Sequence, residues 1–336
     1  MEFNSRLTKE LCELYGPTGR ELRVAEYIQN KIRGHVDEMW TDCLGNLIAH
    51  KKGPGKKVVL SAHMDQLGLM IKTIDEKGFA RIAALGSIKP YNLIDSRVQT
   101  ESGVQGVMLC EKKEDMGKLT HHDLYIDFAA LSAEAVRKKV RIGEVAITRS
   151  EYYENEDCVI MQCLDDRIGC MIIIDNILRD VENTNDMYYV FTVQEENGCF
   201  GAQVSTFDLQ PDLFVTFDVA CTGDELRGIR TDVRLGCGAA IKVMDYFMIV
   251  NKQVVDVLVD IAEKNKVKYQ MEVSETGGTD AHTAQLVRGG IRSGAITIPT
   301  RNIHSRNEMI CKADILECIR LAMALETADL NSRFGA

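Results

Sequence analysis

Short apolar runs that lead directly into acidic residues or histidine recur along this chain. The run Tyr188–Val193 has the composition of an interior strand, and a loop with Glu195, Glu196 and a glycine follows it. The same arrangement follows three other apolar runs, which lead to His63, Asp218 and His304. Open α/β sheets gather functional side chains at the carboxyl ends of their strands, so the pattern predicts an α/β fold with these residues at one edge.

Helical periodicity alternates with these strands. Residues 3–33 predict two amphipathic helices that are broken at Gly16–Gly19, and residues 168–178 predict a nearly all-apolar, buried helix. Further helices are predicted around residues 254–261 and, closing the chain, 315–323. Helices on both faces of a mixed sheet make a three-layer αβα domain.

The segment between His63 and Asp165 has a different pattern, with short apolar runs that glycines interrupt, and it predicts an inserted β-domain. A chain of 336 residues is also long enough for more than one core. We therefore expect a discontinuous catalytic domain, residues 1–68 and 159–336, and a smaller inserted β-barrel-like domain, residues 69–158, with a role in oligomerisation. Proline at position 299 is expected to end a buried strand and leave His304 on a loop.

Composition excludes several classes of function. The formal net charge of −10 argues against a nucleic-acid surface, which needs clustered cations. The eleven cysteines are an odd number without a C-x-x-C pair, so a reducing cytoplasm fits better than a disulfide framework or a thiolate zinc site. The chain shows neither a signal peptide nor a run long enough to span a membrane, and no membrane partner is expected.

Each candidate motif also has an ordinary explanation. His63 and Asp65 lie on one face of an extended segment, where the carboxylate can orient the imidazole, yet such triplets are more often surface or core pairs. Asp165 and Asp166 stand where a helix begins and could simply favour its dipole. Both acids are flanked by apolar sequence, however, so a desolvated crevice is predicted there, in which a metal ion would compensate their charge.

Taken together, the motifs supply the ligands of a two-metal hydrolase. Two neighbouring divalent ions need mixed histidine and carboxylate ligands, with one carboxylate as a bridge. Asp165 is the predicted bridge. Of the two adjacent carboxylates, Glu196 would bind a metal ion, and Glu195 would stay free beside a metal-bound water as the predicted general base. The other predicted ligands are His63, Glu196, Asp218 and His304. His282 is ambiguous and is left out of the set.

In this order, these segments resemble the tetrahedral aminopeptidases, the glutamyl aminopeptidase family of two-metal peptidases within the clan of zinc exopeptidases. The resemblance covers nearly the whole chain. Its blocks are Gly16–Glu21, Asp42–Asn46, Ala62–Asp65, Asp123–Asp127, Asp165–Arg167, Gln194–Glu196, Gly277–Ala281 and Pro299–Arg301. It implies the same bridge, ligands and base, Asp65 as the support of His63, an αβα catalytic domain with an inserted β-barrel-like domain, and a hollow tetrahedral dodecamer.

Some positions depart from the family's usual pattern, and these put the substrate preference in doubt more than the chemistry. They are Gln66 where an acid is frequent, Gly236–Ala239 where Gly-Pro is common, Asn302 where tyrosine is usual and His282 where a small residue is typical.

We therefore expect a metal-dependent aminopeptidase that removes amino-terminal residues from short peptides through a water bridging two ions. Zinc or cobalt suits the ligands best, and manganese is an alternative. A hydrolase of another bond on the same fold, a deacylase or glycoside hydrolase, and a non-catalytic shell or binding protein are the rival hypotheses. Sensitivity to chelators separates a peptidase from a glycosidase, which needs two carboxylates and no metal.

Overall fold

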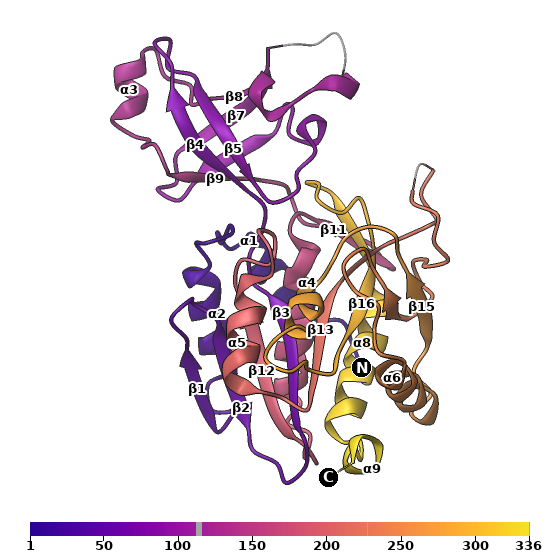
Figure 1. Cartoon of the computed structure of the whole chain (residues 1–336). Helices are drawn as coiled ribbons and strands as arrows, with labels where there is room; N and C mark the ends of the chain where they lie inside the picture. The colour runs from indigo at the N-terminus through magenta and orange to yellow at the C-terminus, as the bar shows by residue number, and fades with distance from the viewer. Residues whose placement is uncertain (112–115, 227, 336) are drawn as a thin grey trace.

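A mixed β-sheet is the largest element of the computed structural model, which describes residues 1–111, 116–226 and 228–335 (Figure 1). Residues 112–115 of the predicted insertion, and 227 and 336 of the predicted catalytic part, lie outside this description. Eleven described strands form the sheet. They are β1 (Glu38–Thr41), β2 (Leu47–Lys51), β3 (Lys57–His63), β10 (Tyr153–Glu154), β11 (Cys158–Met161), β12 (Asp186–Thr192), β13 (Leu213–Cys221), β14 (Ala239–Met244), β15 (Tyr269–Val273), β16 (Ser293–Arg301) and β17 (Glu308–Cys311).

The centre of the sheet is parallel and buried. Strands β12, β3, β13 and β16 run side by side in the same direction, while the outer strands β2, β1, β17, β11 and β10 pair antiparallel. In register, Thr192 lies beside His63 and Asp218 beside Thr297. Because parallel strands end at one edge, their carboxyl ends bring the predicted site residues together.

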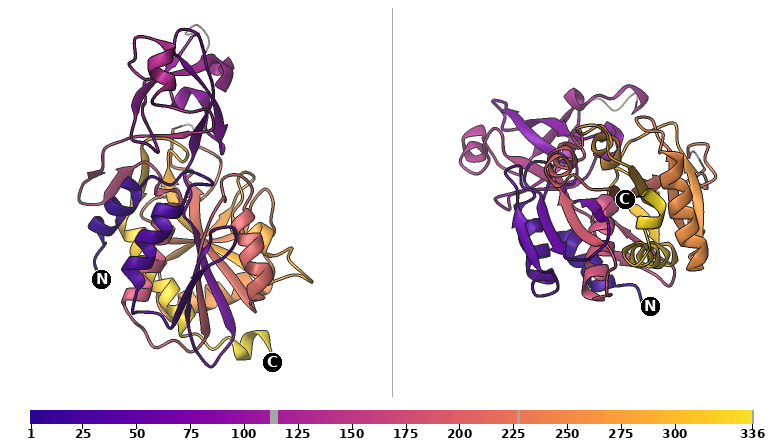
Figure 2. Two further views of the ribbon diagram at one scale, coloured as in Figure 1. Left: turned by 90° about the vertical axis from the view of Figure 1, so that its left-hand side faces the viewer. Right: turned by 60° about the horizontal axis from the view of Figure 1, so that its bottom comes forward.

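Helices cover both faces of the sheet, as two views of the chain show (Figure 2). On one face, α4 packs against β3 and β13 and is flanked by α1, α2 and α8, with α6 beyond α8; α5 and α7 lie on the other face. The helices are α1 (Ser5–Glu13), α2 (Leu22–Ile32), α4 (Leu164–Leu178), α5 (Phe200–Leu209), α6 (Lys252–Lys264), α7 (Asp280–Ala284), α8 (Lys312–Glu326) and α9 (Asn331–Phe334). The predicted αβα architecture is confirmed, although the short α9 rather than α8 is the last helix.

A closed barrel of six strands stands beyond the carboxyl end of β3 (Figure 1). It has its own core, which includes Leu69, Ile82, Met108 and Ile126. Its strands are β4 (Gly68–Ile74), β5 (Ala80–Leu85), β6 (Arg97–Thr100), β7 (Gln105–Cys110), β8 (Leu124–Asp127) and β9 (Val145–Thr148), with the short helices η1 (Pro90–Asn92), η2 (Met116–Lys118), η3 (His121–Asp123) and α3 (Ala133–Arg137) between them. The predicted barrel-like insertion is confirmed as a fold; its domain boundaries stay a prediction, and β10, inside the predicted range, pairs in the large sheet.

Pro299 does not end its strand, which corrects the sequence-based prediction. β16 continues to Arg301, and Pro299 lies beside Ala220 of the parallel neighbour β13. On the other side of β16, Ile296 and Thr297 pair with β14, and Thr300 and Arg301 pair with β17. Proline therefore occupies a gap between two ladders, where its missing N–H is tolerated.

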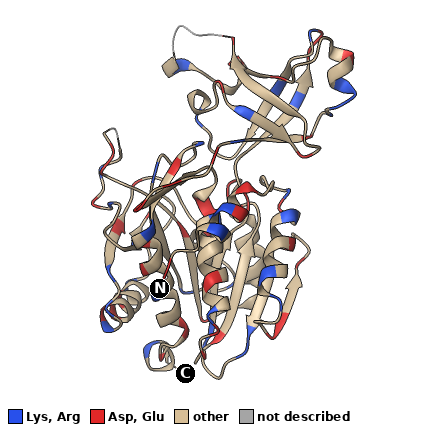
Figure 3. Ribbon diagram, turned by 180° about the vertical axis from the view of Figure 1, so that it is seen from behind, with Lys and Arg blue, Asp and Glu red and all other residues tan. Residues whose placement is uncertain are grey.

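Charges of both signs are interspersed over the sheet domain and the barrel in the view of Figure 3. Within the residues that the structure describes, no helix has the length and apolar character that crossing a membrane requires.

The carboxyl group of Glu326, buried at the end of α8, makes the stability of the fold depend on pH. It accepts hydrogen bonds from the Tyr189 hydroxyl and, at 2.6 Å, from Asn176 Nδ2. Burial raises its pKa to about 7, against the opposing hydrogen bond from Tyr189. Because the folded state then holds a proton that the unfolded state releases near its ordinary pKa, stability falls as the pH rises from about 4.5 to about 7.

We predict that Glu326→Gln, which keeps an acceptor oxygen and cannot ionise, removes this contribution. The free energy of unfolding of the wild type should fall by up to about 3 kcal/mol relative to the variant across that pH window. Denaturant unfolding at a series of pH values measures it, with the exposed Glu26→Gln as control. Parallel curves for the wild type and Glu326→Gln would contradict it.

Candidate metal centre

Five of the predicted residues meet at the carboxyl edge of the sheet in two overlapping groups. His63, Asp165 and Asp218 form one group, and Asp165, Glu196 and His304 form the other; within each, one potential ligand atom per residue lies within 4.8 Å of the others. Asp165, at the start of α4, belongs to both groups. That is the position of the predicted bridge, although the metal-ligand roles themselves stay predictions.

Both histidines turn Nε2 toward the shared acids. His63 Nε2 lies 3.0 Å from Asp165 Oδ1, while His63 Nδ1 lies 3.1 Å from the carbonyl oxygen of Asp65. His304 Nε2 lies 3.3 Å from Asp165 Oδ2 and 3.4 Å from Glu196 Oε2, while its Nδ1 lies 3.0 Å from the carbonyl oxygen of Ser87. A carbonyl oxygen only accepts, so Nδ1 donates in both rings and Nε2 is the nitrogen available to a metal ion.

The acids of this cluster are strongly perturbed. Burial raises the pKa of Glu196 to about 7 and raises the pKa of Asp218 well above its usual range. Burial would also raise the pKa of Asp165, yet hydrogen bonds with His304 and His63 hold it below the ordinary value. Burial would lower the pKa of His304, but Glu196 and Asp165 raise it to about 10. The acids therefore compete for the few positive charges nearby.

Divalent ions fit this set of residues. Glu196 Oε1 is buried without a hydrogen-bond partner among the described residues, and a buried unpaired carboxylate oxygen is costly. Two imidazoles and three carboxylates are the donors that zinc, cobalt and manganese accept. Cations bound to both groups would compensate the buried negative charge.

Asp65 fixes the loop that carries the two glutamates. Its fully buried carboxylate accepts the backbone N–H of Glu195 at 3.0 Å and of Glu196 at 3.2 Å, and the hydroxyl of Thr18 also donates to it. Its Oδ1 lies 3.5 Å from His63 Nδ1. Asp65 thus lies against His63, whose support by Asp65 stays a prediction, and its carboxylate also holds the backbone of both glutamates, a contact that the sequence did not reveal. Thr18 belongs to the block Gly16–Glu21, but the position of Thr18 in the sequence does not indicate a contact with Asp65.

Glu308 at the start of β17 is a further residue that the sequence analysis missed. Its buried carboxylate accepts the backbone N–H of Asp165 at 3.0 Å and of His304 at 2.9 Å. It therefore ties together the two backbone segments that carry members of both groups. The only sequence feature that indicates a role for Glu308 is its position as an acidic residue directly before the short apolar run Met309–Cys311.

We predict that Glu308→Gln weakens metal binding about 10–100-fold, the range for groups that orient metal ligands. Glutamine offers one acceptor oxygen where two N–H groups need one each, so either Asp165 or His304 loses its restraint. Competition with a chelator of known affinity measures the change. Unchanged affinity in a variant that remains folded would contradict this positioning role.

Glu195 stands beside the two groups without belonging to either. Its Oε1 accepts a hydrogen bond from the Cys199 thiol, with 3.1 Å between sulfur and oxygen. Burial raises its pKa well above the usual range, and His63 opposes this. A carboxylate with that tendency to hold a proton, close to a metal centre, has the property of a general base. His282 lies near Cys199 and outside both groups, and its exclusion from the metal ligands stays a prediction.

A groove of about 560 Å³ is lined by Ile303 and Ser305, the neighbours of His304 in the chain, and by none of the five clustered side chains. It lies between the barrel, the end of β13 and the loop that carries His304; its lining includes Asn92, Cys221, Glu225, Asn302 and Ser305. Asn92 Nδ2 also donates to the carbonyl oxygen of His304 at 3.3 Å. Asn302, one of the unusual positions, thus lies where a bound molecule would contact it.

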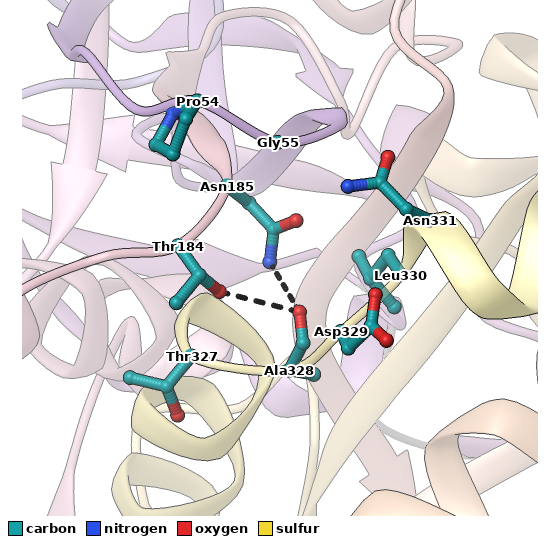
Figure 4. Close-up of a pocket in the computed structure, with 9 residues that line it drawn as sticks. All are labelled: Pro54, Gly55, Thr184, Asn185, Thr327, Ala328, Asp329, Leu330 and Asn331. Carbon is teal, nitrogen blue, oxygen red and sulfur yellow. Dashed lines mark hydrogen bonds between the residues drawn. The ribbon is translucent and has the colours of Figure 1, made fainter. Parts of the chain in front are cut away.

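A second hollow, of about 310 Å³, lies at the opposite edge of the sheet (Figure 4). Pro54, Gly55, Thr184 and Asn185, which precede β3 and β12, line it together with residues 327–331, which follow α8. Thr184 Oγ1 and Asn185 Nδ2 donate to the carbonyl oxygen of Ala328 there. These groups hold backbone segments together and include none of the predicted site residues.

Comparison with known proteins places this geometry in a family. The profile of the M42 glutamyl aminopeptidase family matches residues 45–321. A protein of Acetivibrio thermocellus that is provisionally named an aminopeptidase is 41% identical over 94% of this chain and 96% of its own length. The lysyl aminopeptidase of Pyrococcus furiosus is 32% identical over 95% of each chain.

Among solved structures, the TET1 peptidase of Pyrococcus horikoshii superposes with a TM-score of 0.86 and 28% identity, covering 96% of this chain and 98% of its own. That protein can assemble into a tetrahedron or a large octahedral shell. The likeness extends through the sheet domain and the barrel alike.

Proposed function

This chain belongs to the M42 glutamyl aminopeptidase family, and from that premise we propose that it is a two-metal aminopeptidase acting on short peptides with a free amino terminus. The observation that carries the proposal is the pair of ligand groups that share Asp165. Family membership supports aminopeptidase activity, and the shared acid supports the metal-dependent mechanism.

The ions would be held by His63 and Asp218 on one side and by Glu196 and His304 on the other, with Asp165 between them. When bound, two such ions supply Lewis acids that polarise the peptide carbonyl and make a nearby water more acidic. Zinc and cobalt suit these ligands best and manganese is possible, because imidazole and carboxylate donors accept all three.

Glu195 would move the proton. In this role its carboxylate takes a proton from the attacking water and returns it to the leaving amine, which would otherwise depart as a poor leaving group. Asp65 would keep Glu195 in reach through its hydrogen bond to the Glu195 N–H. The Cys199 thiol occupies Oε1, so the other carboxylate oxygen would be the proton acceptor.

The substrate would enter through the groove beside His304. A peptide's α-ammonium group is attracted to the acidic cluster, while the side chain of its first residue would extend toward Asn302 and Glu225. Relatives are named for both lysyl and glutamyl residues, so the lining of this groove would set the preference. We further propose a homo-oligomer, a dodecamer by similarity to the solved structure of a tetrahedral relative.

The test is cleavage of matched substrates by metal-loaded protein. A panel of aminoacyl anilides and short peptides is offered with a free and with an acetylated amino terminus, together with acylated amino acids and a β-glucan. Cleavage of only the free-terminus members supports the proposal. Cleavage of the acylated amino acids would support the deacylase hypothesis, and release of sugar would support the glycoside hydrolase hypothesis. If no substrate is cleaved, the result would support a shell or binding protein.

A further inference from the structure

A third group of potential ligands lies next to the two already described. Carboxylate oxygens of Glu195 and Asp280 and the sulfur of Cys199 all lie within 4.8 Å of one another. The three residues come from the loop after β12, the residue before α5 and the start of α7. Separate segments of the chain thus converge on one point.

An unsatisfied atom marks this point as a site for a ligand. Asp280 is only 1% exposed; its Oδ2 accepts a hydrogen bond from Thr192 at 2.5 Å, whereas Oδ1 is buried with no hydrogen-bond partner among the described residues. A buried carboxylate oxygen without a donor is costly unless a cation or a proton reaches it. Cys199, 3% exposed, offers it a soft neighbour.

No cation of the protein is paired with these acids in the described part of the chain. The ion pairs of the site among the described residues connect His63 and His304 to Asp65, Asp165 and Glu196, and none involves Glu195 or Asp280. His282 Nδ1 lies 2.8 Å from the carbonyl oxygen of Thr279, to which it donates, and 3.7 Å from Cys199 Sγ. That nitrogen gives its proton to the carbonyl, and burial together with Glu195 raises the pKa of the Cys199 thiol, so the sulfur keeps its proton until a cation displaces it.

We propose that Glu195, Cys199 and Asp280 form a third, inhibitory site for a borderline-soft divalent cation of the zinc type. One sulfur and two carboxylate oxygens leave a position for water, as three-ligand zinc sites do. On binding, the thiol proton passes to the solvent and a sulfur–metal bond replaces the hydrogen bond to Glu195 Oε1. The cation would then occupy the carboxylate that the proposed function uses as its base, so excess zinc would suppress the reaction.

Sulfur gives this site a signature that the other two lack. The two proposed catalytic groups contain only imidazole and carboxylate donors, so a thiolate-to-cobalt charge-transfer band can arise only where a cysteine binds the ion. Cobalt titration of metal-stripped protein should show no such band for about the first two equivalents and a band with about the third.

The matched variants are Cys199→Ser, which should abolish the band, and Cys221→Ser, which should retain it although Cys221 is the more exposed of the two cysteines. Serine keeps the size and a hydroxyl donor to Glu195, so folding is preserved. Absence of the band in the wild type, or its persistence in Cys199→Ser, would overturn the proposal. This readout needs no peptidase activity, so its failure is distinct from failure of the proposed function.

The inhibitory part rests on the proposed function and has its own readout. Activity at saturating zinc should fall about 100-fold below its value at two equivalents in the wild type, since loss of a general base removes about 10²–10⁴-fold. The activity of each protein is compared with its own activity at two equivalents of zinc. In Cys199→Ser, this decline at saturating zinc should be absent. An equal decline in both proteins would overturn the inhibitory role and assign the inhibition to another site.

Discussion

Replacing Glu195 by glutamine lowers kcat by about 10²–10⁴-fold and leaves KM and the binding of the two proposed catalytic ions nearly unchanged. The amide retains an oxygen for the Cys199 thiol and keeps the backbone N–H that Asp65 accepts, so the loop holds its position. What it loses is the ability to take up a proton. Because Glu195 belongs to neither of the two ligand groups that share Asp165, the loss should affect turnover and not the content of these two ions, measured at two equivalents of metal.

The control for this variant is Glu26→Gln on the exposed face of α2, which changes net charge equally. Steady-state kinetics with a free-terminus peptide, together with elemental analysis of bound metal, separates the two effects. A variant that keeps more than a tenth of wild-type kcat would contradict the assignment of Glu195 as the base.

Asp165→Asn produces the largest loss: kcat/KM falls about 10³-fold or more, and binding of both ions is reduced. Catalytic ions lower the activation free energy by several kcal/mol, and each loss of about 1.4 kcal/mol slows the reaction tenfold. The amide of asparagine is uncharged and has only one acceptor oxygen. The Asp165 carboxylate, in contrast, faces His63 with one oxygen and His304 with the other. Both groups are therefore weakened by one substitution.

Comparison with variants of a single group makes this test specific. Glu196→Gln and Asp218→Asn each change one group only, so each should weaken one ion while the second remains bound. Elemental analysis after dialysis gives the number of retained ions, and the exposed Asp180→Asn serves as control. Two retained ions in Asp165→Asn would contradict a bridging role.

The parts of this fold that the sequence predicts are those governed by local periodicity. Interior strands such as Lys57–His63 show continuous apolar runs, and α2 and α6 show one apolar face, so both kinds of element are visible without tertiary information. Parallel strands end at a common edge, and that rule alone brings His63, Asp218 and the loop of Glu195 together.

The parts that were missed depend on contacts between distant segments. Thr18 reaches Asp65, and Glu308 reaches the backbone of Asp165 and His304, across separations that no local pattern encodes. The sequence predicts a strand end at Pro299 because the gap between its neighbouring ladders exists only in the assembled sheet. The contact between His282 on α7 and Cys199 likewise joins segments that are far apart in the sequence.

The most direct test of the central claim is the rate at which metal-stripped protein releases the first residue of a short peptide as zinc or cobalt is added back in steps. We expect a negligible rate without metal and a rise that reaches its maximum at about two equivalents per chain. Activity of the stripped protein equal to that of the metal-loaded protein, or a maximum at about one equivalent, would contradict a two-metal aminopeptidase.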